Sequence, residues 1–205
     1  MKIEEYPPAH VPPQRLEALA QEFLKKYNPN EDLPVPIEEI VEFDLGLNIV
    51  PLPNLKKDLD VEGFLSLSRR EISVDQGQLE GYETRFRFTL AHEVGHMLLH
   101  SRLYEGLGIR SLEQWIGFLE TTDSGLISNY EWQARNLAGR ILVPEAALIE
   151  IARRHLKRVP ADVIEKVTPR EVLRSLSIPL ADEFLVSAIV VENRLLGDRV
   201  GERLG

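Results

Sequence analysis

Residues 92–96 read His-Glu-Val-Gly-His, and they lie within a stretch of helical character that covers residues 84–101. Apolar side chains occur on all sides of this stretch, a pattern typical of a buried helix. In an α-helix a spacing of four residues corresponds to a rotation of about 400°. We therefore expect His92 and His96 one turn apart on the same helical face, where their imidazoles can bind one metal ion.

Glu93 follows His92 directly and adds a carboxylate to this pair. It lies about 100° around the helix from His92 and can reach the side of the ion where a bound water would lie. Zinc lowers the pKa of its bound water towards about 7, and a nearby carboxylate takes the proton as the hydroxide attacks a polarised carbonyl. The alternative is a pair of ordinary core histidines, but a buried Glu93 is costly unless a partner compensates its charge. The pattern favours a zinc hydrolase with Glu93 as the catalytic base.

Two histidines need a third ligand, and spacing and composition restrict its type. In a metzincin the third histidine follows the first by about ten residues. That position is Arg102, and Leu99 occupies the position of the glycine that the pattern requires. A deformylase-type site needs a cysteine ligand, and the chain contains no cysteine. A carboxylate from another helix is the remaining option.

Glu131 is the best candidate for this carboxylate, because it falls in the first turn of a helix that we expect over residues 130–143. A second interpretation of the same residue stays open. Residues 128–131 fit a capping box, in which the Glu131 side chain would bond back to the backbone amide of Ser128.

Composition and charge argue against a nucleic-acid-binding, secreted or membrane protein. The 24 Lys and Arg against 33 Asp and Glu give a formal charge of −9, which disfavours nucleic acid as the main ligand. Residues 1–8 contain two acids and two prolines, unlike a signal peptide. The most apolar uncharged run, residues 184–191, is eight residues long, whereas a membrane span needs about 20. We expect a cytoplasmic protein with no membrane contact and no direct nucleic-acid contact.

The hydrophobic pattern along the chain predicts the α+β class. Strand-like alternation predicts a small sheet of about three strands, packed against the helix that carries His92 and His96. The strands are expected at residues 47–52, 63–68 and 72–74, and further helices at residues 14–26, 36–43, 145–156, 169–176 and within 179–196.

Residues 87–100 (RFTLAHEVGHMLLH) and 131–144 (EWQARNLAGRILVP) resemble the two signature motifs of the ImmA/IrrE family of zincin-like metallopeptidases. In that family the leading glutamate of the second motif is the third zinc ligand, so the resemblance assigns this role to Glu131. It implies a zincin-like peptidase domain, which we expect over residues 1–143, with a helical C-terminal part over residues 144–205 packed on the same domain.

The second motif departs from the family pattern at three positions. Arg135 stands where the family has Asn, Leu137 where it has Phe, and Gly139 where it has Ala. Of these, Arg135 affects hydrogen bonding around the site and not the existence of the site.

Several residues near the motifs keep two interpretations. His100 continues the face of His92 and His96 but lies about 6 Å beyond His96 along the axis, so it either supports the site or simply packs. The strand at residues 63–68 either pairs with an extended substrate backbone or is an ordinary edge strand. The candidates for stabilising an oxyanion are Tyr82, Tyr104, Tyr130 and His155.

These observations lead to one main functional hypothesis and two alternatives. The main one is a zinc-dependent endopeptidase in which His92, His96 and Glu131 bind Zn²⁺ and Glu93 activates the zinc-bound water. The resemblance implies a regulatory protein as the substrate, commonly a helix-turn-helix transcriptional repressor. The first alternative is a zinc-dependent sensor that binds a regulator without cleaving it. The second is a DNA-binding regulator that uses the C-terminal helical hairpin, although residues 179–205 contain five acids and three arginines.

Overall fold

The computed structural model describes residues 10–66, 70–107, 112–160 and 166–204. The first half of the chain forms α1 (Pro13–Tyr27), α2 (Ile37–Glu39), the π-helical turn η2 (Ile40–Asp44), β1 (Asn48–Leu52), α3 (Leu55–Leu59), β2 (Gly63–Leu65), β3 (Glu71–Asp75), α4 (Gln76–Gly81) and α5 (Glu83–Leu99). The second half forms α6 (Ser101–Leu107), α7 (Leu112–Thr121), α8 (Ser124–Leu142), α9 (Glu145–Leu156), α11 (Pro169–Phe184), α12 (Ala188–Glu192), η3 (Asn193–Gly197) and η4 (Val200–Arg203).

The sheet is small and mixed, with the strand order β1-β3-β2. β1 and β3 run parallel with Asn48 opposite Glu71, and β2 runs antiparallel to β3 with Phe64 opposite Ser73. The α+β class and the three-stranded sheet predicted from the sequence are thus confirmed. β2 is shorter than expected, because Ser66 lies beyond its end; Leu67 and Ser68 are outside the described residues.

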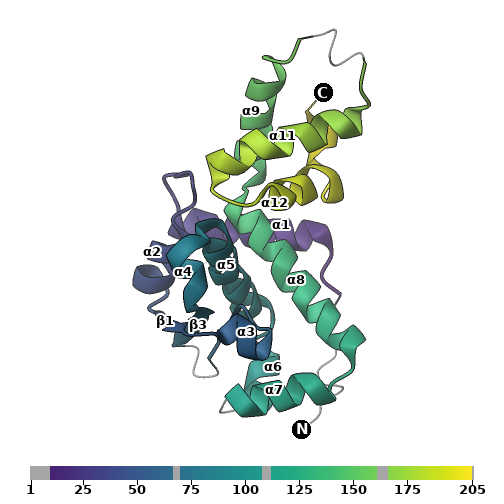
Figure 1. Ribbon diagram of the computed structural model, residues 1–205. Helices are drawn as coiled ribbons and strands as arrows, with labels where there is room; N and C mark the ends of the chain where they lie inside the picture. The colour runs from purple at the N-terminus through teal and green to yellow at the C-terminus, as the bar shows by residue number, and fades with distance from the viewer. Residues whose placement is uncertain (1–9, 67–69, 108–111, 161–165, 205) are drawn as a thin grey trace.

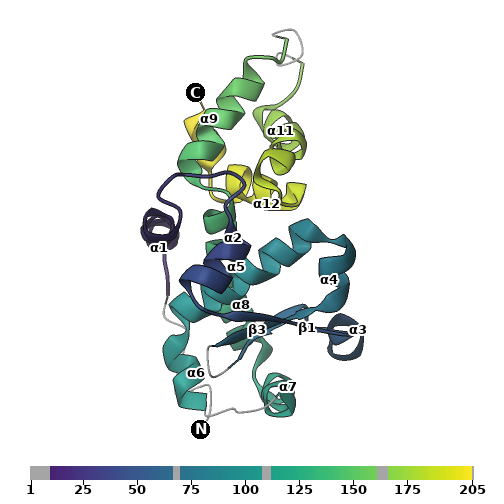
Figure 2. The ribbon, with the colours of Figure 1, turned by 90° about the vertical axis from the view of Figure 1, so that its left-hand side faces the viewer.

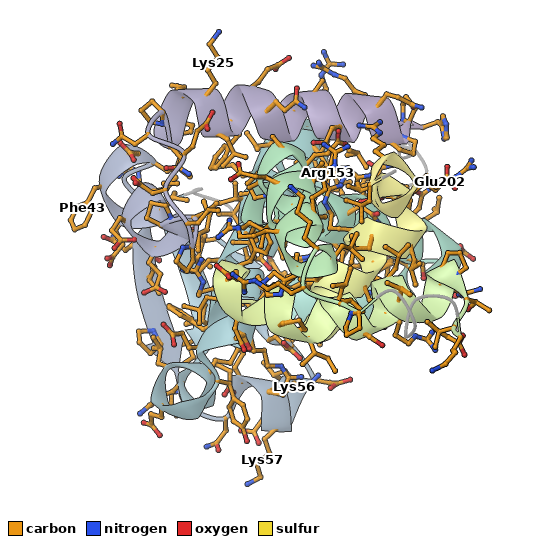
Figure 3. All side chains as sticks on the ribbon, turned by 90° about the horizontal axis from the view of Figure 1, so that it is seen from above. Lys25, Phe43, Lys56, Lys57, Arg153 and Glu202 are labelled. Carbon is orange, nitrogen blue, oxygen red and sulfur yellow. The ribbon has the colours of Figure 1, made fainter. Side chains whose placement is uncertain are left out.

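Two long helices, α5 and α8, form the centre of the molecule. They pack against each other, and α5 also packs on β2 and β3. Figures 1 and 2 show the sheet and α4 on one side of this pair of helices. Helices α9, α11 and α12 lie together at the C-terminal end of α8. The main hydrophobic core includes Leu16 of α1, Ile72 of β3, Leu90 of α5, Leu137 of α8 and Leu180 of α11. Peripheral side chains such as Lys25, Phe43 and Lys57 point outwards (Figure 3).

Helices α3, α4, α6 and α7 have no counterpart in the sequence prediction, and two predicted helices have different bounds. α8 begins at Ser124 and not at Tyr130, because Asp123 accepts hydrogen bonds from the backbone amides of Gly125 and Leu126 and so starts the helix earlier. α11 continues to Phe184 past Pro179, where we expected two separate segments. The other expected helices and strands occur close to their predicted positions.

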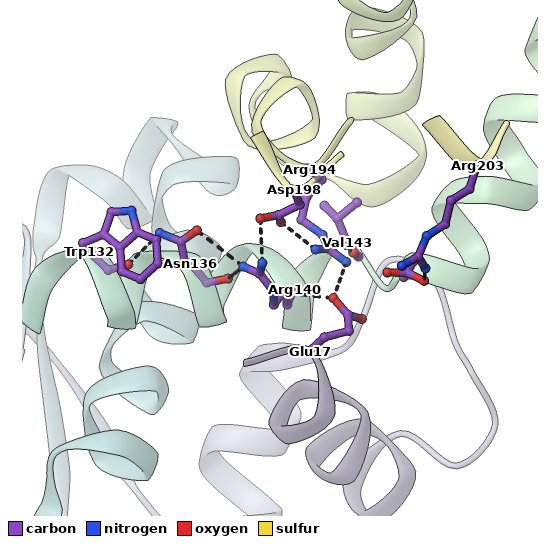
Figure 4. Close-up of polar contacts among 9 residues, drawn as sticks. Glu17, Trp132, Asn136, Arg140, Val143, Arg194, Asp198 and Arg203 are labelled. Carbon is purple, nitrogen blue, oxygen red and sulfur yellow. Dashed lines mark hydrogen bonds and ion pairs between the residues drawn. The ribbon is translucent and has the colours of Figure 1, made fainter. Parts of the chain in front are cut away.

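A buried cluster of charges joins three distant parts of the chain. Arg194 of η3, which is 2% exposed, pairs with Asp198 at 2.6 Å and with Glu17 of α1 at 3.0 Å. Its Nε also donates to the carbonyl of Val143 at 3.1 Å. Arg140 of α8 pairs with the same Asp198 at 2.6 Å. Figure 4 shows this cluster between α1, α8 and the C-terminal helices.

Removing Arg194 should therefore destabilise the protein strongly. Arg194→Ala leaves the partly buried Glu17 and Asp198 with one arginine between them, and breaking a buried pair costs about 3–5 kcal/mol in the free energy of unfolding. Urea denaturation measures this cost. The control is Arg199→Ala, which removes an exposed pair with Glu202 and should cost less than about 1 kcal/mol. Equal losses in the two variants would contradict the role of the cluster.

Candidate metal centre

His92 and His96 lie one turn apart on α5 and face the same point. Their Nε2 atoms are 3.0 Å apart, and both side chains are largely buried. Four zinc ligands in tetrahedral geometry, with bonds of about 2.0–2.1 Å, lie roughly 3.3 Å from one another. The spacing of the two nitrogens is thus close to the spacing that two ligands of one ion require.

Glu131 of α8 reaches the same point from the other side. Its Oε2 lies 3.1 Å from the Nε2 of His92, and its Oε1 lies 3.2 Å from the Nε2 of His96. These three residues form a group that can hold a metal ion, with all ligand atoms within 4.8 Å of one another. The capping-box interpretation of Glu131 is wrong, because Ser128 lies inside α8 and its Oγ bonds the carbonyl of Ser124.

Gly95 allows α8 to approach α5 this closely. A Cβ atom at Gly95 would lie 2.8 Å from the backbone carbonyl oxygen of Ala134 and 3.1 Å from its Cα. Glycine inside a helix costs about 1 kcal/mol relative to alanine. The contact explains why this buried helix keeps a glycine between its two histidines.

Gly95→Ala should therefore cost stability and also weaken metal binding. The added methyl group meets backbone atoms, which cannot rotate away, so we expect a loss of about 1–3 kcal/mol in the free energy of unfolding. Because the helices must separate, Glu131 moves away from the histidines and zinc affinity falls. Gly117→Ala is the matched control, since nothing lies within 4 Å of a Cβ there. Thermal unfolding with and without zinc compares the two; equal behaviour would exclude the close-contact role.

His100 supports His96 from the side away from Glu131. The Nδ1 atoms of His96 and His100 are 3.0 Å apart, and the Nε2 of His100 lies 3.1 Å from Oε1 of Gln133. Burial and then the charge of His96 lower the pKa of His100 to about 4, so it is neutral at pH 7. The consistent assignment has His96 donating from Nδ1 to His100, and His100 donating from Nε2 to Gln133. The Nε2 lone pair of His96 then points at Glu131.

This hydrogen-bond chain makes the donor set suitable for a cation. In this assignment the Nε2 atom of His96 carries a lone pair. This atom lies 3.0 Å from the Nε2 of His92 and 3.2 Å from Oε1 of Glu131. Burial raises the pKa of Glu131, but the two imidazoles, when they are protonated at Nε2, donate hydrogen bonds and place positive charge beside it; these effects outweigh burial and lower that pKa well below its usual range. Burial lowers the pKa of His92, but the hydrogen bond to Glu131 and the charge of Glu93 outweigh it and raise that pKa. The carboxylate thus favours positive charge at this point, and the residues fit a divalent metal.

Glu93 is held by the backbone of the neighbouring strand. It is buried, and its Oε2 accepts a hydrogen bond of 2.8 Å from the backbone amide of Leu65. Leu65 lies on β2, the strand at the edge of the sheet, and its amide points away from β3. Sequence reasoning missed this partner, because a backbone amide carries no residue-specific signal. The bond compensates part of the cost of burying the carboxylate.

A cavity of about 480 Å³ gives access to these residues. Its lining includes His92, Glu93, His96, Glu131 and Arg135. Arg135, which is exposed, places Nη2 4.0 Å from Oε2 of Glu131, so the arginine found in place of the family asparagine lies at the mouth of the site.

The candidates for oxyanion stabilisation lie in different places. Tyr130 packs its ring edge-on against His100 at 4.7 Å, and His155 lies on α9 near Glu183. Tyr82 is exposed at the start of α5, outside the lining of this cavity. The side chain of Tyr104 is outside the described part of the chain.

Comparison with known proteins gives two matches. A family model described as the IrrE N-terminal-like domain, Peptidase_M78, matches residues 44–196. A solved structure of a Mycobacterium tuberculosis transcriptional regulator is similar with a TM-score of 0.55 and 14% identity, over 89% of this chain and 46% of that chain. This chain thus spans less than half of that structure, and the likeness shows the fold alone. No curated protein matches the chain. Within the described residues, none of the helices is long and apolar enough to cross a membrane.

Proposed function

The chain belongs to the Peptidase_M78 family, that of the IrrE N-terminal-like domain, and on this basis we propose that it is a zinc-dependent endopeptidase. The membership confirms the family resemblance of the two sequence motifs and suggests a metallopeptidase. One observation carries the proposal: two imidazole nitrogens and one carboxylate converge within 4.8 Å beside a buried glutamate.

The proposed metal ligands are Nε2 of His92, Nε2 of His96 and the carboxylate of Glu131. A zinc ion bound there would polarise the carbonyl of a peptide bond and make water more acidic. His100 and Gln133 hold the imidazole of His96 in the orientation that this ligand set needs, as outer partners of metal-binding histidines do.

Glu93 is the proposed general base. The amide of Leu65 holds Oε2, which orients the carboxylate towards the cavity, and we assign Oε1 as the atom that takes the proton from the attacking water. The same oxygen then delivers a proton to the nitrogen of the leaving peptide.

β2 is the proposed binding edge for the substrate backbone. An extended peptide can add to an exposed sheet edge through backbone hydrogen bonds, which gives affinity without requiring a particular side chain. Because Leu65 already donates to Glu93, Gly63 and the carbonyl of Leu65 are the groups left for this pairing.

The proposed substrate is a helix-turn-helix transcriptional repressor. The family resemblance implies a regulatory protein, and the structurally similar protein is itself named a transcriptional regulator. The charge of −9 favours encounter with a basic, DNA-binding partner. Such a substrate would place the reaction in the cytoplasm. The division into a peptidase domain over residues 1–143 and a helical part over residues 144–205 also stays a proposal.

Incubation of the zinc-loaded protein with a repressor encoded beside its own gene tests this proposal. We expect a single cut in the repressor, lost when a chelator removes the metal and restored when zinc is added back. A repressor that stays intact with stoichiometric zinc-loaded protein would contradict the substrate assignment. Mass spectrometry of the fragments identifies the bond.

A further inference from the structure

A second cavity, of about 800 Å³, lies beside the metal centre and has no part in the mechanism above. It is enclosed by the start of α5, by α8, and by α12 with η3. Its large apolar lining side chains are Tyr82, Phe88, Trp132, Ile189 and Val190, and we call the hollow between them the apolar groove. In Figure 4, Trp132 and Asn136 follow α8 towards Arg194 and Asp198, which also line this cavity.

Three large side chains of the groove face water. The exposed fraction is 62% for Tyr82, 47% for Trp132 and 57% for Ile189. They come from separate elements, so the fold brings them together around one hollow. Apolar side chains exposed singly are ordinary, but a group around a cavity indicates a binding site. A volume of about 800 Å³ lies within the range of ligand pockets, roughly 300–1,000 Å³.

The groove is adjacent to the cavity of the metal centre. Glu62, Phe88 and Arg135 line both cavities. The two cavities therefore lie on either side of Phe88 and Arg135, one at His92 and Glu131 and the other at Trp132 and α12. A polypeptide that passes the metal centre has this hollow beside it on one side of the bond that is cut.

Apart from the exposed Arg135, which lies 4.0 Å from Glu131, the charged groups around the groove are paired closely within the protein. Arg85 donates to Glu62 at 2.9 Å, and Arg194 pairs with Asp198 at 2.6 Å. These pairs leave the surface of the groove mainly apolar, so the chemistry favours large apolar side chains over charged ones.

We propose that the apolar groove binds large apolar side chains of the polypeptide substrate, on one side of the cleaved bond, and so sets the sequence preference of the enzyme. This inference rests on the proposed function. It also assigns a role to the C-terminal hairpin: α12 forms a wall of the groove through Ile189. The five acids and three arginines of residues 179–205 disfavour contact of this hairpin with DNA.

Binding can be measured separately from cleavage. The chain has two tryptophans, so in a Trp115→Phe, Glu93→Gln background the emission of Trp132 reports the groove directly. Synthetic peptides of Gly, Ser and Ala that carry a Phe–Leu pair at successive positions should cause a saturable blue shift. Peptides with Ser–Ser in place of the pair should not. Ile189→Lys should weaken binding about tenfold or more, since a charge enters the groove.

Ile178→Lys is the matched control. Ile178 is 66% exposed on α11 and does not line the groove, so peptide binding should stay unchanged. The absence of a blue shift, or equal effects of the two lysine variants on peptide binding, would contradict the proposed binding role of the groove. A concentration-dependent dimer in which Trp132 is already protected, and from which peptide is excluded, would show a second copy as the occupant and also overturn it.

Cleavage by the otherwise unmodified zinc-loaded enzyme separates this inference from the proposed function. We expect cuts at a fixed distance from the Phe–Leu pair, with kcat/KM about tenfold lower for Ile189→Lys and unchanged for Ile178→Lys. Cleavage without preference for the Phe–Leu pair would contradict the proposed role of the groove but would still support the peptidase function. Peptide binding at Trp132 with no cleavage of either the peptides or the repressor would support the groove and contradict the peptidase.

Discussion

Replacing Glu131 by alanine is expected to abolish stoichiometric zinc binding. Loss of a residue that only orients a metal ligand typically lowers metal affinity about 10–100-fold, so loss of a direct ligand should exceed about 100-fold. The carboxylate is also the only negative charge that touches both imidazoles among the described contacts, at 3.1 and 3.2 Å. Titration of zinc against a chromophoric chelator measures the change.

The control for this variant is Glu150→Ala on α9. Glu150 is highly exposed and meets only Arg154 at 3.9 Å among the described ion pairs, so zinc affinity should be unaffected. Zinc should also raise the unfolding free energy of the wild type, by about 4 kcal/mol at a thousandfold excess over Kd. In Glu131→Ala this stabilisation should disappear. Full zinc affinity in Glu131→Ala would exclude the proposed ligand set.

Glu93→Gln is expected to keep zinc but lose cleavage. Glutamine preserves the size of the side chain, and its carbonyl oxygen can still accept from the amide of Leu65, so the fold and the metal ligands stay in place. It cannot take a proton, and removing a general base lowers kcat by about 10²–10⁴-fold. Zinc content and repressor cleavage are measured on the same preparation, with Glu42→Gln, exposed on η2, as the control.

The outcome for Glu93→Gln also decides between hydrolysis and binding. If the variant still cleaves at the wild-type rate, Glu93 is not the base. If it no longer cleaves but regulates the repressor as the wild type does, the protein acts as a zinc-dependent sensor. The endopeptidase hypothesis requires that cleavage and regulation are lost together.

The local part of the site could be predicted from the sequence because helix geometry determines it. The four-residue spacing of His92 and His96 places their imidazoles on one helical face, where their Nε2 atoms lie 3.0 Å apart in the folded protein. The partner from α8 depends on tertiary packing. Residues 128–131 alone allow either a helix start or an interior turn, and the family resemblance favoured Glu131 before the contact at Gly95 explained its position.

The long-range parts of the structure have no local signal. From the sequence, Arg87 is expected to be an exposed arginine at the start of a helix. In the structure it is buried, and its guanidinium donates to the carbonyls of Val35 and Leu185. Gln133 reads as an ordinary helical residue, yet its side chain meets His100. The apolar groove likewise joins Tyr82, Trp132 and Ile189, which only the packing of α12 beside α5 and α8 brings together.

The most direct test of the account is a zinc anomalous difference map from crystals of the zinc-loaded protein. The proposed site predicts one strong peak about 2.0–2.2 Å from Nε2 of His92, Nε2 of His96 and an oxygen of Glu131. His100 should lie outside this ligand set, bonded to His96. A peak away from these three residues, or no peak in zinc-saturated crystals, would contradict the central claim.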